Sequence, residues 1–441
     1  MSAHRINDGK VYDLIGVGAG PFNLGLACLL EKVPEVDALF FEQKEQFDWH
    51  PGMLIEGTRL QVPFLADLVT MADPTNPFSY LNYLKEHNRL YHFYFLQRME
   101  MPRNEYNHYC QWAANQLENC LFGHEVVNVQ YHQDQEYFEV KAHDHETGTI
   151  RSSFGRHLVL GVGTVPFIPE SFQGYPAKDV FHTSEFLDHQ ERCRDAESIT
   201  IVGSGQSAAE VFRGLLKERE KCGYSLDWMT RSKSYFPMEE TKLSLEHFSP
   251  DYVNYFYSLP QEKRDEIFPT QDLLYKGISA HTINDIYNLL YEQTVAGKNP
   301  DVRLRPLTKV NGIQGNSDEG TYTLNCTQWQ KEVDFTHESE VVIVATGYKP
   351  NIPKFMEDMD EWIGYDDQGR FKITQDYRLE LKHEGSNQIF SHTGISHSHG
   401  VGTTNLGLAV YRNKMIINGV AGEEIYPVHE DHVFQQFDVE A

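Results

Sequence analysis

The sequence has few cysteines and no long apolar run. Its six cysteines form no CxxC pair and no zinc-ligand spacing, so we interpret them as scattered, reduced thiols and expect no metal. No stretch reaches the roughly 18 apolar residues that a membrane-spanning helix needs. Residues 1–9 carry no apolar signal core. We therefore expect a cytoplasmic protein without a membrane partner.

Basic charge is also scarce. The chain has 38 lysines and arginines against 64 acidic residues, which gives a net charge of −26. A nucleic-acid-binding surface needs a basic face, so this balance argues against nucleic acid as a partner. The acidic excess would mildly attract cationic substrates, but charge alone favours the simpler explanation that it keeps the protein in solution. With 441 residues, the chain is long enough for two or three globular domains.

A glycine-rich turn near the N-terminus organises the chain. The mostly apolar residues 11–15 predict a buried parallel strand, and Gly16, Gly18 and Gly20 follow directly. Residues 24–30 then have helical character. Strand, glycine turn and helix in this order are typical of a dinucleotide-binding fold, in which the backbone approaches a pyrophosphate at a helix N-terminus.

An acid follows the next predicted strand. Residues 38–41 form a short apolar run that ends at Glu42, near the place where a ribose hydroxyl needs an acceptor. The alternative is a tight turn that binds no ligand. The acid after the strand favours dinucleotide binding.

Residues 198–216 repeat this arrangement. A strand at 198–202 leads into Gly203 and Gly205, and a helix follows from residue 209. The next strand, residues 226–230, ends at Arg231, Ser232 and Lys233 instead of an acid. A cation at this position suits a 2′-phosphate, so the pattern favours NADPH over NADH. A simple cluster of surface charge is the alternative.

Other segments complete an α/β fold with two dinucleotide-binding (Rossmann-like) domains and a smaller, mostly helical substrate region. Residues 157–163 and 340–350 read as further buried strands that end at glycines. Residues 236–300 look helical and rich in aromatic side chains. We predict an FAD-binding domain at 1–170 and 335–441, an NADPH-binding domain at 171–235 and 301–334, and a substrate-binding region at 236–300.

Two nucleotide sites in one chain imply hydride transfer from NADPH to a flavin. Disulfide reductases pass the electrons to a CxxC pair, which this chain lacks, so O₂ is the expected acceptor. The chemistry is then that of a flavin C4a-hydroperoxide, which transfers one oxygen atom to an amine, a thioether or a ketone. No acid–base triad is required, and His50, His182, His397 and His399 are more simply explained as core or surface residues.

The chain resembles, over nearly its whole length, the N-hydroxylating flavin monooxygenases of siderophore biosynthesis. Members of that family act on lysine, ornithine, diamines or histamine. An S-oxygenase or a ketone monooxygenase would share the glycine turns but not the block at 67–77, and a non-catalytic nucleotide sensor is the remaining alternative. The matching stretches are residues 16–23, 49–53, 60–61, 64–65, 67–70, 73–77, 82–84, 203–208 and 345–348.

The resemblance implies roles for individual residues, and a dimer or tetramer of identical chains. Residues implied to hold FAD are Gly16, Gly18, Gly20, Pro21, Asn23, Glu42 and Gln43, with Trp49 and His50 along the flavin. Gln61 is implied to lie near the redox ring and the nicotinamide, as the catalytic position. Residues implied to hold NADPH are Gly203, Gly205, Gln206, Ser207, Arg231 and Ser232.

Two departures from the family pattern concern the substrate. In the lysine and ornithine enzymes a Phe-Leu-Lys-Asp-Leu motif supplies a lysine that pairs with the α-carboxylate, and this chain has Ala66 there. Where those enzymes tend to show Asn-Tyr-Ser, this chain has Leu274 at the asparagine. Losing a charge-assisted contact costs about 1.5–3 kcal/mol. Both changes predict a small primary amine without an α-carboxylate.

A third departure bears on the far end of that amine. Many relatives carry an acid where this chain has Thr403, which favours a less charged tail such as imidazole. Histamine is therefore narrowly preferred over putrescine or cadaverine. Glu239, Glu240 or Asp272 could instead supply an anion for a diamine. Lysine or ornithine is the alternative substrate.

Overall fold

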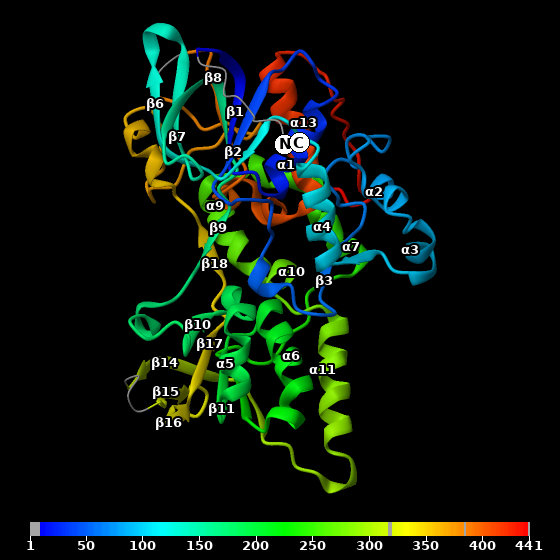
Figure 1. Ribbon diagram of the computed structural model, residues 1–441, viewed down its shortest axis with the longest axis vertical. Helices are drawn as coiled ribbons and strands as arrows, with labels where there is room; N and C mark the ends of the chain where they lie inside the picture. Colours follow the sequence, from blue (N-terminus) through cyan, green and yellow to red (C-terminus); the bar gives the residue numbers. More distant parts are fainter. Residues whose placement is uncertain (1–8, 316–319, 383–384, 440–441) are drawn as a thin grey trace.

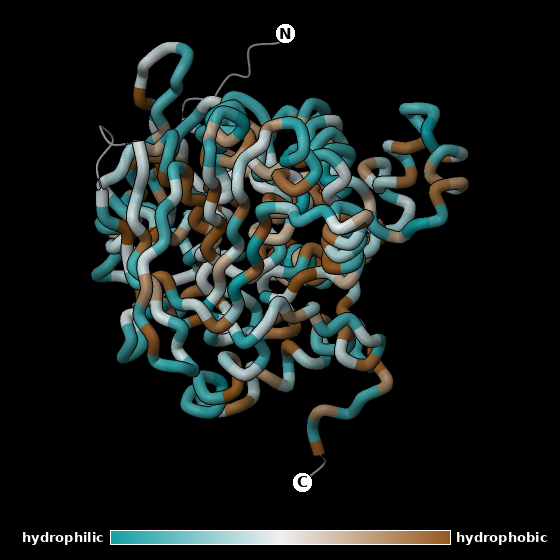
Figure 2. Tube along the Cα trace, turned by 90° about the horizontal axis from the view of Figure 1, so that it is seen from below, coloured by the Kyte–Doolittle hydropathy of each residue, from teal (hydrophilic) through white to brown (hydrophobic). Residues whose placement is uncertain are grey.

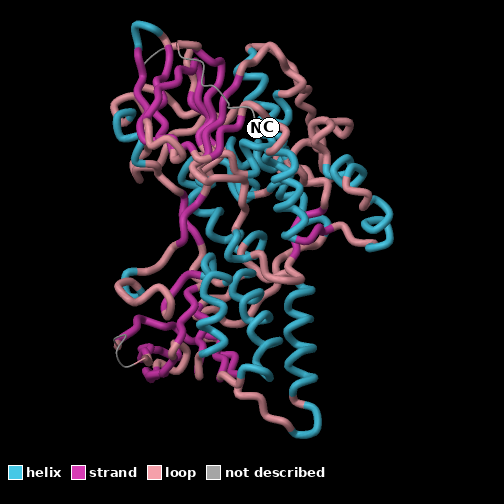
Figure 3. Tube along the Cα trace, viewed as in Figure 1, coloured by secondary structure: helices cyan, strands magenta, loops and turns pink. Residues whose placement is uncertain are grey.

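Figure 1 shows the computed structural model of the chain, which describes residues 9–315, 320–382 and 385–439. The molecule is elongated, with the seven-stranded sheet toward one end and the five-stranded sheet toward the other, where a three-stranded sheet lies beside it. Figure 3 shows helices between the two sheets and a thin two-stranded ribbon that joins them, made of β9 (Thr164–Pro166) and β18 (Tyr348–Pro350). Among the described helices, none combines the length and the apolar character that crossing a bilayer requires.

The first sheet is built around β1 (Val11–Val17). This strand pairs in parallel with β2 (Ala38–Glu42) and β8 (Ile150–Leu160), and the register places Leu14 opposite Ala38. Helix α1 (Pro21–Leu30) follows β1 directly. The sheet is completed by β5 (Cys120–Phe122), β6 (His124–His132), β7 (Tyr137–Asp144) and β19 (Ile389–Ser391).

The second sheet is entirely parallel, as its apolar strands predict. Its strand order is β10 (Val180–His182), β17 (Val341–Val344), β11 (Ser198–Val202), β12 (Ser225–Met229) and β13 (Val302–Arg305). Helix α6 (Gln206–Cys222) follows β11. A three-stranded antiparallel sheet lies beside it, made of β14 (Thr308–Gln314), β15 (Tyr322–Gln328) and β16 (Val333–Ser339). The expected fold, with two Rossmann-like units, is confirmed.

The predicted domain boundary at residue 335 is wrong for one segment. We assigned residues 335–344 to the FAD-binding domain, but β16 pairs with β15 and β17 pairs with β10 and β11. A buried apolar strand reads the same in either sheet, so the pattern alone could not place it. We propose to place this boundary after β17; the rest of the domain division stays a proposal.

Residues 236–300 are mostly helical, but they divide between two cores. Tyr252 and Phe256 of α8 (Pro250–Ser258) are buried against Val401. Ile286 of α11 (Ala280–Gln293) is instead buried in the core of the second sheet. The other helices of this region are α7 (Lys242–Leu245), α9 (Gln261–Ile267) and α10 (Asp272–Tyr275).

The remaining elements lie around the first sheet and on the connections. Figure 2 shows hydrophobic segments gathered in the interior of the molecule and mostly hydrophilic segments along its periphery. The long segment after Glu42, expected to be a loop with short helices, also contains a strand, β3. These elements are β3 (Arg59–Pro63), α2 (Tyr80–Glu86), α3 (Leu90–Leu96), β4 (Glu100–Pro102), α4 (Arg103–Ala114), α5 (Gln190–Asp195), α12 (Ser396–His399) and α13 (Leu406–Ala421).

Candidate dinucleotide and substrate sites

The first glycine turn forms one wall of a large cavity. Gly18 has φ +85°, and a Cβ on it would lie 2.5 Å from the carbonyl oxygen of Gly161, so the turn requires glycine there. A Cβ on Gly20 would meet nothing within 4 Å, which leaves the backbone open to a ligand at the start of α1. Pro21 occupies the first turn of that helix. Gly16 is buried instead, against the ring of Phe40.

Asn23 lies behind this turn. Its side chain is 1% exposed, and its Nδ2 donates a hydrogen bond to the carbonyl oxygen of Gly18 at 2.7 Å. It is not among the residues that line the cavity. The resemblance implied that Asn23 holds phosphate, whereas the structure shows its amide bracing the turn that would do so.

Glu42 closes the same wall at the end of β2. Its carboxylate accepts hydrogen bonds from the N–H of Ala19 at 2.9 Å and from the N–H of Lys44 at 3.0 Å. It lines the cavity together with the exposed Gln43. The predicted acceptor therefore lies against the turn with its orientation fixed by two backbone donors.

The cavity has a volume of about 1880 Å³ and extends from the first glycine turn to the helical region. It suits an extended ligand such as a dinucleotide, because the glycine turn, the acid and aromatic side chains all face it. The predicted site residues that line it are Gly18, Gly20, Pro21, Glu42, Gln43, Trp49, His50, Gln61, Leu274 and Thr403.

His50 is held as a neutral ring. Burial lowers its pKa to about 4, and the charges of Arg103 and Lys44 add to the shift. The ring meets Trp49 edge-on at 4.9 Å and Tyr348 edge-on at 5.7 Å, measured between ring centroids. His50 therefore carries no charge near neutral pH and belongs to an aromatic wall.

Gln61 links two parts of the chain across the cavity. It lies on β3, and its Nε2 contacts the Sδ of Met238 at 3.6 Å. Both residues line the cavity, and Met238 precedes the helices of the substrate region. The predicted catalytic position thus lies where β3 meets that region.

His392 was not predicted and is the clearest omission. It is 3% exposed and lines the cavity, and within the described part of the chain neither ring nitrogen has a hydrogen-bond partner. Burial, with Arg412 beside it, holds its pKa well below the usual range. A buried ring with two unused nitrogens fits a polar ligand in this cavity. The only signal in the sequence is its position directly after β19.

The other histidines that the sequence raised are structural. The two ring nitrogens of His182 form hydrogen bonds, Nδ1 with the Ser184 hydroxyl and Nε2 with the carbonyl oxygen of Gly347. The ring of His397 bonds the carbonyl oxygen of Phe371. The ring of His399 bonds the carbonyl oxygen of Gln375. These contacts support the interpretation of the three histidines as structural residues, with His182 and His399 buried and His397 half-buried.

The second glycine turn lies outside this cavity. Gly203 has φ +142°, and a Cβ on it would clash with the carbonyl oxygen of Ala345. The Ser204 hydroxyl contacts the Ser232 hydroxyl at 3.0 Å, which joins the turn to the end of β12. Arg231 is exposed, and within the described residues its side chain makes no ion pair. A cation is therefore free beside the turn, as the sequence predicted.

Gln206 and Ser207 begin helix α6 after this turn. The Gln206 side chain accepts a hydrogen bond from the N–H of Ser279 at 2.8 Å and donates one to the Glu210 carboxylate at 2.8 Å. The bond to Ser279 joins α6 to the residue before α11. Ser207 is half-buried, and Gly205 leaves room for a ligand, since a Cβ there would be 3.8 Å from the nearest atom, the carbonyl oxygen of Lys276. The Gln206 side chain is thus already engaged within the protein, so the predicted contact with NADPH would have to come from its backbone.

Two of the three predicted substrate positions, Leu274 and Thr403, line the cavity. Ala66 is 8% exposed and packs beside the backbone of Gly407. Leu274 is half-buried on the lining. The Thr403 hydroxyl contacts the Ser396 hydroxyl at 2.8 Å and donates to the carbonyl oxygen of Gly400 at 3.1 Å. The structure therefore brings Leu274 and Thr403 onto the lining and places Ala66 just behind it.

Carboxylates also face this cavity. Of the three acids considered for a distal ammonium, only Glu240 lines it; Glu239 accepts the N–H of Thr241, and Asp272 pairs with Lys276. Glu100, on β4, lines it too. Burial raises the pKa of Glu240, and the charge of Glu100 raises it further. A cationic ligand would relieve this repulsion.

Comparison with known proteins places the chain among flavin enzymes. The family model for L-lysine 6-monooxygenase/L-ornithine 5-monooxygenase matches residues 10–350. A putrescine N-hydroxylase of Shewanella oneidensis is 41% identical over 98% of this chain and 85% of its own length. The crystal structure of a cadaverine monooxygenase of the desferrioxamine pathway from Erwinia amylovora, bound to FAD, is 40% identical, with a TM-score of 0.94 over 98% of this chain and all of that one.

A Kutzneria ornithine N-hydroxylase, solved with reduced FAD, NADP⁺ and L-ornithine, has a TM-score of 0.86 at 27% identity over 93% of this chain and 99% of its own. The two glycine turns, the cavity and these relatives agree with one another. The chain therefore belongs to the L-lysine 6-monooxygenase/L-ornithine 5-monooxygenase family, the N-hydroxylating monooxygenases that its sequence resembles.

Proposed function

We propose that the protein uses FAD, NADPH and O₂ to hydroxylate one nitrogen of a small aliphatic diamine, putrescine or cadaverine, for siderophore biosynthesis. One observation carries the choice of substrate. At the two positions implied to bind an α-carboxylate in the family, Leu274 lines the cavity and Ala66 is a buried alanine outside the lining, and the carboxylates of Glu240 and Glu100 also line the cavity. Relatives that are 40–41% identical and act on putrescine or cadaverine support it.

The chain offers separate places for the two cofactors. The backbone of Gly18 and Gly20 would hold the FAD pyrophosphate, and Glu42 would accept a ribose hydroxyl. The turn at Gly203 would hold NADPH, with Arg231 on its 2′-phosphate. Bound flavin supplies the activated oxygen, and the protein's own task is to position the amine and exclude water.

The far end of the substrate decides between the candidate amines. A diamine keeps its distal nitrogen protonated, and Glu240 would form a charge-assisted hydrogen bond with it, worth about 1.5–3 kcal/mol. The N–H of Glu239 bonds the carbonyl oxygen of Leu273 at 2.9 Å, which brings this segment beside Leu274. Glu240 thereby stands next to the apolar wall that a carbon chain would contact.

The preference for histamine weakens on this evidence. That preference rested on Thr403, which replaces an acid and cannot balance the charge of a distal ammonium. The Thr403 hydroxyl is already bonded to Ser396 and Gly400, so a carboxylate for a diamine would have to come from another residue. Glu240 supplies one. Histamine stays an untested prediction, as do the homo-oligomer and the cytoplasmic location.

The test is hydroxylamine formed against NADPH consumed, for putrescine, cadaverine, histamine, lysine and ornithine in parallel. We expect tightly coupled product from a diamine and uncoupled oxidation with the two amino acids. Coupled product only from lysine or ornithine would overturn the meaning given to Ala66 and Leu274. Coupled product only from histamine would restore the argument from Thr403.

A further inference from the structure

A group of metal-ligating side chains lies on the β6–β7 hairpin, at the edge of the cavity described above: Glu125 lines that cavity, whereas His143 and His145 do not. Glu125 on β6 and His143 on β7 are directly opposed in the antiparallel register. His145 follows two residues later, and its N–H donates to the carbonyl oxygen of Gly123 at 2.9 Å, so the pairing continues past the end of β7. Because side chains two residues apart in a strand share a face, both rings stand beside the carboxylate.

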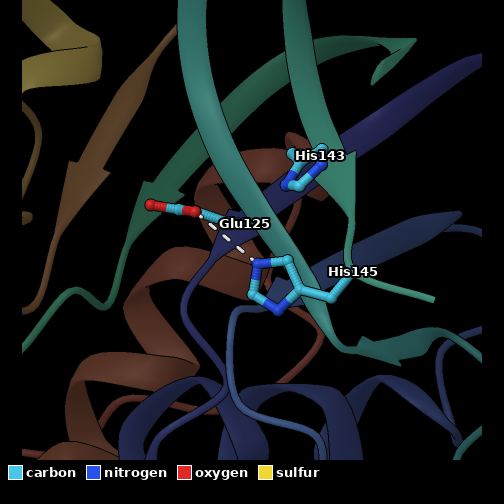
Figure 4. Close-up of side chains that lie close together, drawn as sticks. All are labelled: Glu125, His143 and His145. Atoms are coloured by element: carbon cyan, nitrogen blue, oxygen red, sulfur yellow. Dashed lines mark ion pairs between the residues drawn. The ribbon is translucent and has the colours of Figure 1, made fainter. Parts of the chain in front are cut away.

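The ligand atoms converge. One atom from each of Glu125, His143 and His145 lies within 4.8 Å of the others, and the two imidazole centroids are 5.4 Å apart. Figure 4 shows the Glu125 carboxylate directed toward the His145 ring, with the His143 ring on the neighbouring strand. Ligands of a tetrahedral zinc ion lie about 3.3 Å from each other. Rotation of these partly exposed side chains can close that difference.

A second carboxylate stands on the other side of His145. Nε2 of His145 is 3.6 Å from Glu125, whereas its Nδ1 is 3.8 Å from Glu45. Metal-bound histidines usually donate their other ring N–H to a carboxylate, which fixes the tautomer and raises the basicity of the ligand. Within the described residues, neither Glu45 nor Glu125 pairs with a lysine or arginine. The acids therefore remain available for a cation.

We propose that Glu125, His143 and His145 bind a divalent transition metal such as Zn²⁺, with Glu45 orienting His145 through its Nδ1–H. Two imidazoles and one carboxylate form a zinc ligand set, and water completes the coordination. Glu45 follows Glu42 and Gln43 in the chain, so the metal would join the loop after β2 to the hairpin.

The experiment titrates the FAD-loaded protein with Zn²⁺ by calorimetry and compares it with His143→Ala/His145→Ala. We expect the native protein to bind one more Zn²⁺ per chain than the double variant. His132→Ala is the matched control, because it removes a histidine that pairs with Glu139 at 2.9 Å on the same hairpin and leaves the cluster intact. It should bind as the native protein does.

Two further variants keep the test sharp. Glu125→Gln replaces a half-exposed ligand, so it folds even if the double variant does not, and it should lose the same Zn²⁺. Glu45→Gln should keep the site but weaken binding about tenfold. Equal Zn²⁺ binding by the native protein and by Glu125→Gln would overturn the proposal, because the ions would then be held elsewhere.

Discussion

The two glycine turns share a local design but stand in different surroundings. The first faces a cavity of about 1880 Å³, and an acid at the end of the neighbouring strand is bonded to the turn itself. The second lies outside that cavity, and the neighbouring strand β12 is followed two residues later by the exposed Arg231. A glycine turn lets a phosphate approach; the residue after the next strand and the depth of the site decide which nucleotide binds and how firmly.

This difference suits the two cofactors to different roles. Helix α1, behind the first turn, is buried from Asn23 to Leu30, so a ligand there is held by a rigid part of the core. The second turn is joined to β12 by the contact between Ser204 and Ser232 and is open to solvent at Arg231. We expect FAD to remain bound through many turnovers and NADPH to bind anew for each one.

The largest expected effect is that of Gly18→Ala. The new Cβ would combine left-handed strain with a clash against Gly161, together about 2–5 kcal/mol. We expect this variant to be purified without flavin. The equivalent change in the second turn, Gly203→Ala, should keep flavin and lose NADPH binding. Flavin absorbance and NADPH titration measure the two outcomes.

Gly223→Ala is the control for backbone strain alone. Gly223 has φ +86° with nothing within 4 Å of a Cβ, so its substitution adds strain without a clash and should keep both cofactors. If Gly203→Ala also emptied the flavin site, the two turns would not act independently, and the comparison would fail.

The next largest effect is that of pH on turnover. The reacting nitrogen must be neutral, and an aliphatic amine has a pKa near that of lysine, about 10.4, so kcat/KM should rise up to tenfold per pH unit. His50, with its pKa lowered to about 4, is already neutral over this pH range, so its titration adds no inflection to the pH profile of kcat/KM. Measurement from about pH 6.5 to 9 tests this. A flat profile would contradict it, and His50→Gln should leave the slope unchanged.

Arg231→Ala tests the second turn. Removing the cation should raise KM for NADPH about tenfold, because a charge-assisted contact to the 2′-phosphate is lost, and should leave KM for NADH and the flavin content unchanged. Lys233→Ala, two residues on and also exposed, is the matched control. Equal increases for NADPH and NADH would show that Arg231 does not read the 2′-phosphate.

Sequence sufficed for the features that depend on neighbours along the chain. The sequence predicted both glycine turns, Glu42 and Arg231, because each lies at the end of a predicted strand or just after it. It did not suffice where contacts join distant segments. Gln206 meets Ser279, and His392 reaches the cavity only because β19 pairs with β8. Asn23 points inward because its side-chain amide donates to the carbonyl oxygens of Val17 and Gly18, and no sequence pattern predicts these contacts.

The smallest predicted effect concerns Glu240, on the lining of the cavity that the first glycine turn faces. Glu240→Gln keeps the shape of the side chain and removes its charge, so a protonated tail loses about 1.4 kcal/mol and KM for putrescine or cadaverine should rise up to tenfold. A monoamine such as butylamine has no such tail and should be unaffected. Glu239→Gln is the matched control, because its carboxylate is already bonded to Thr241. If Glu240→Gln raised KM for butylamine as much as for putrescine, the charge would act on something shared by both substrates, and Glu240 would belong to the cofactor side of the cavity.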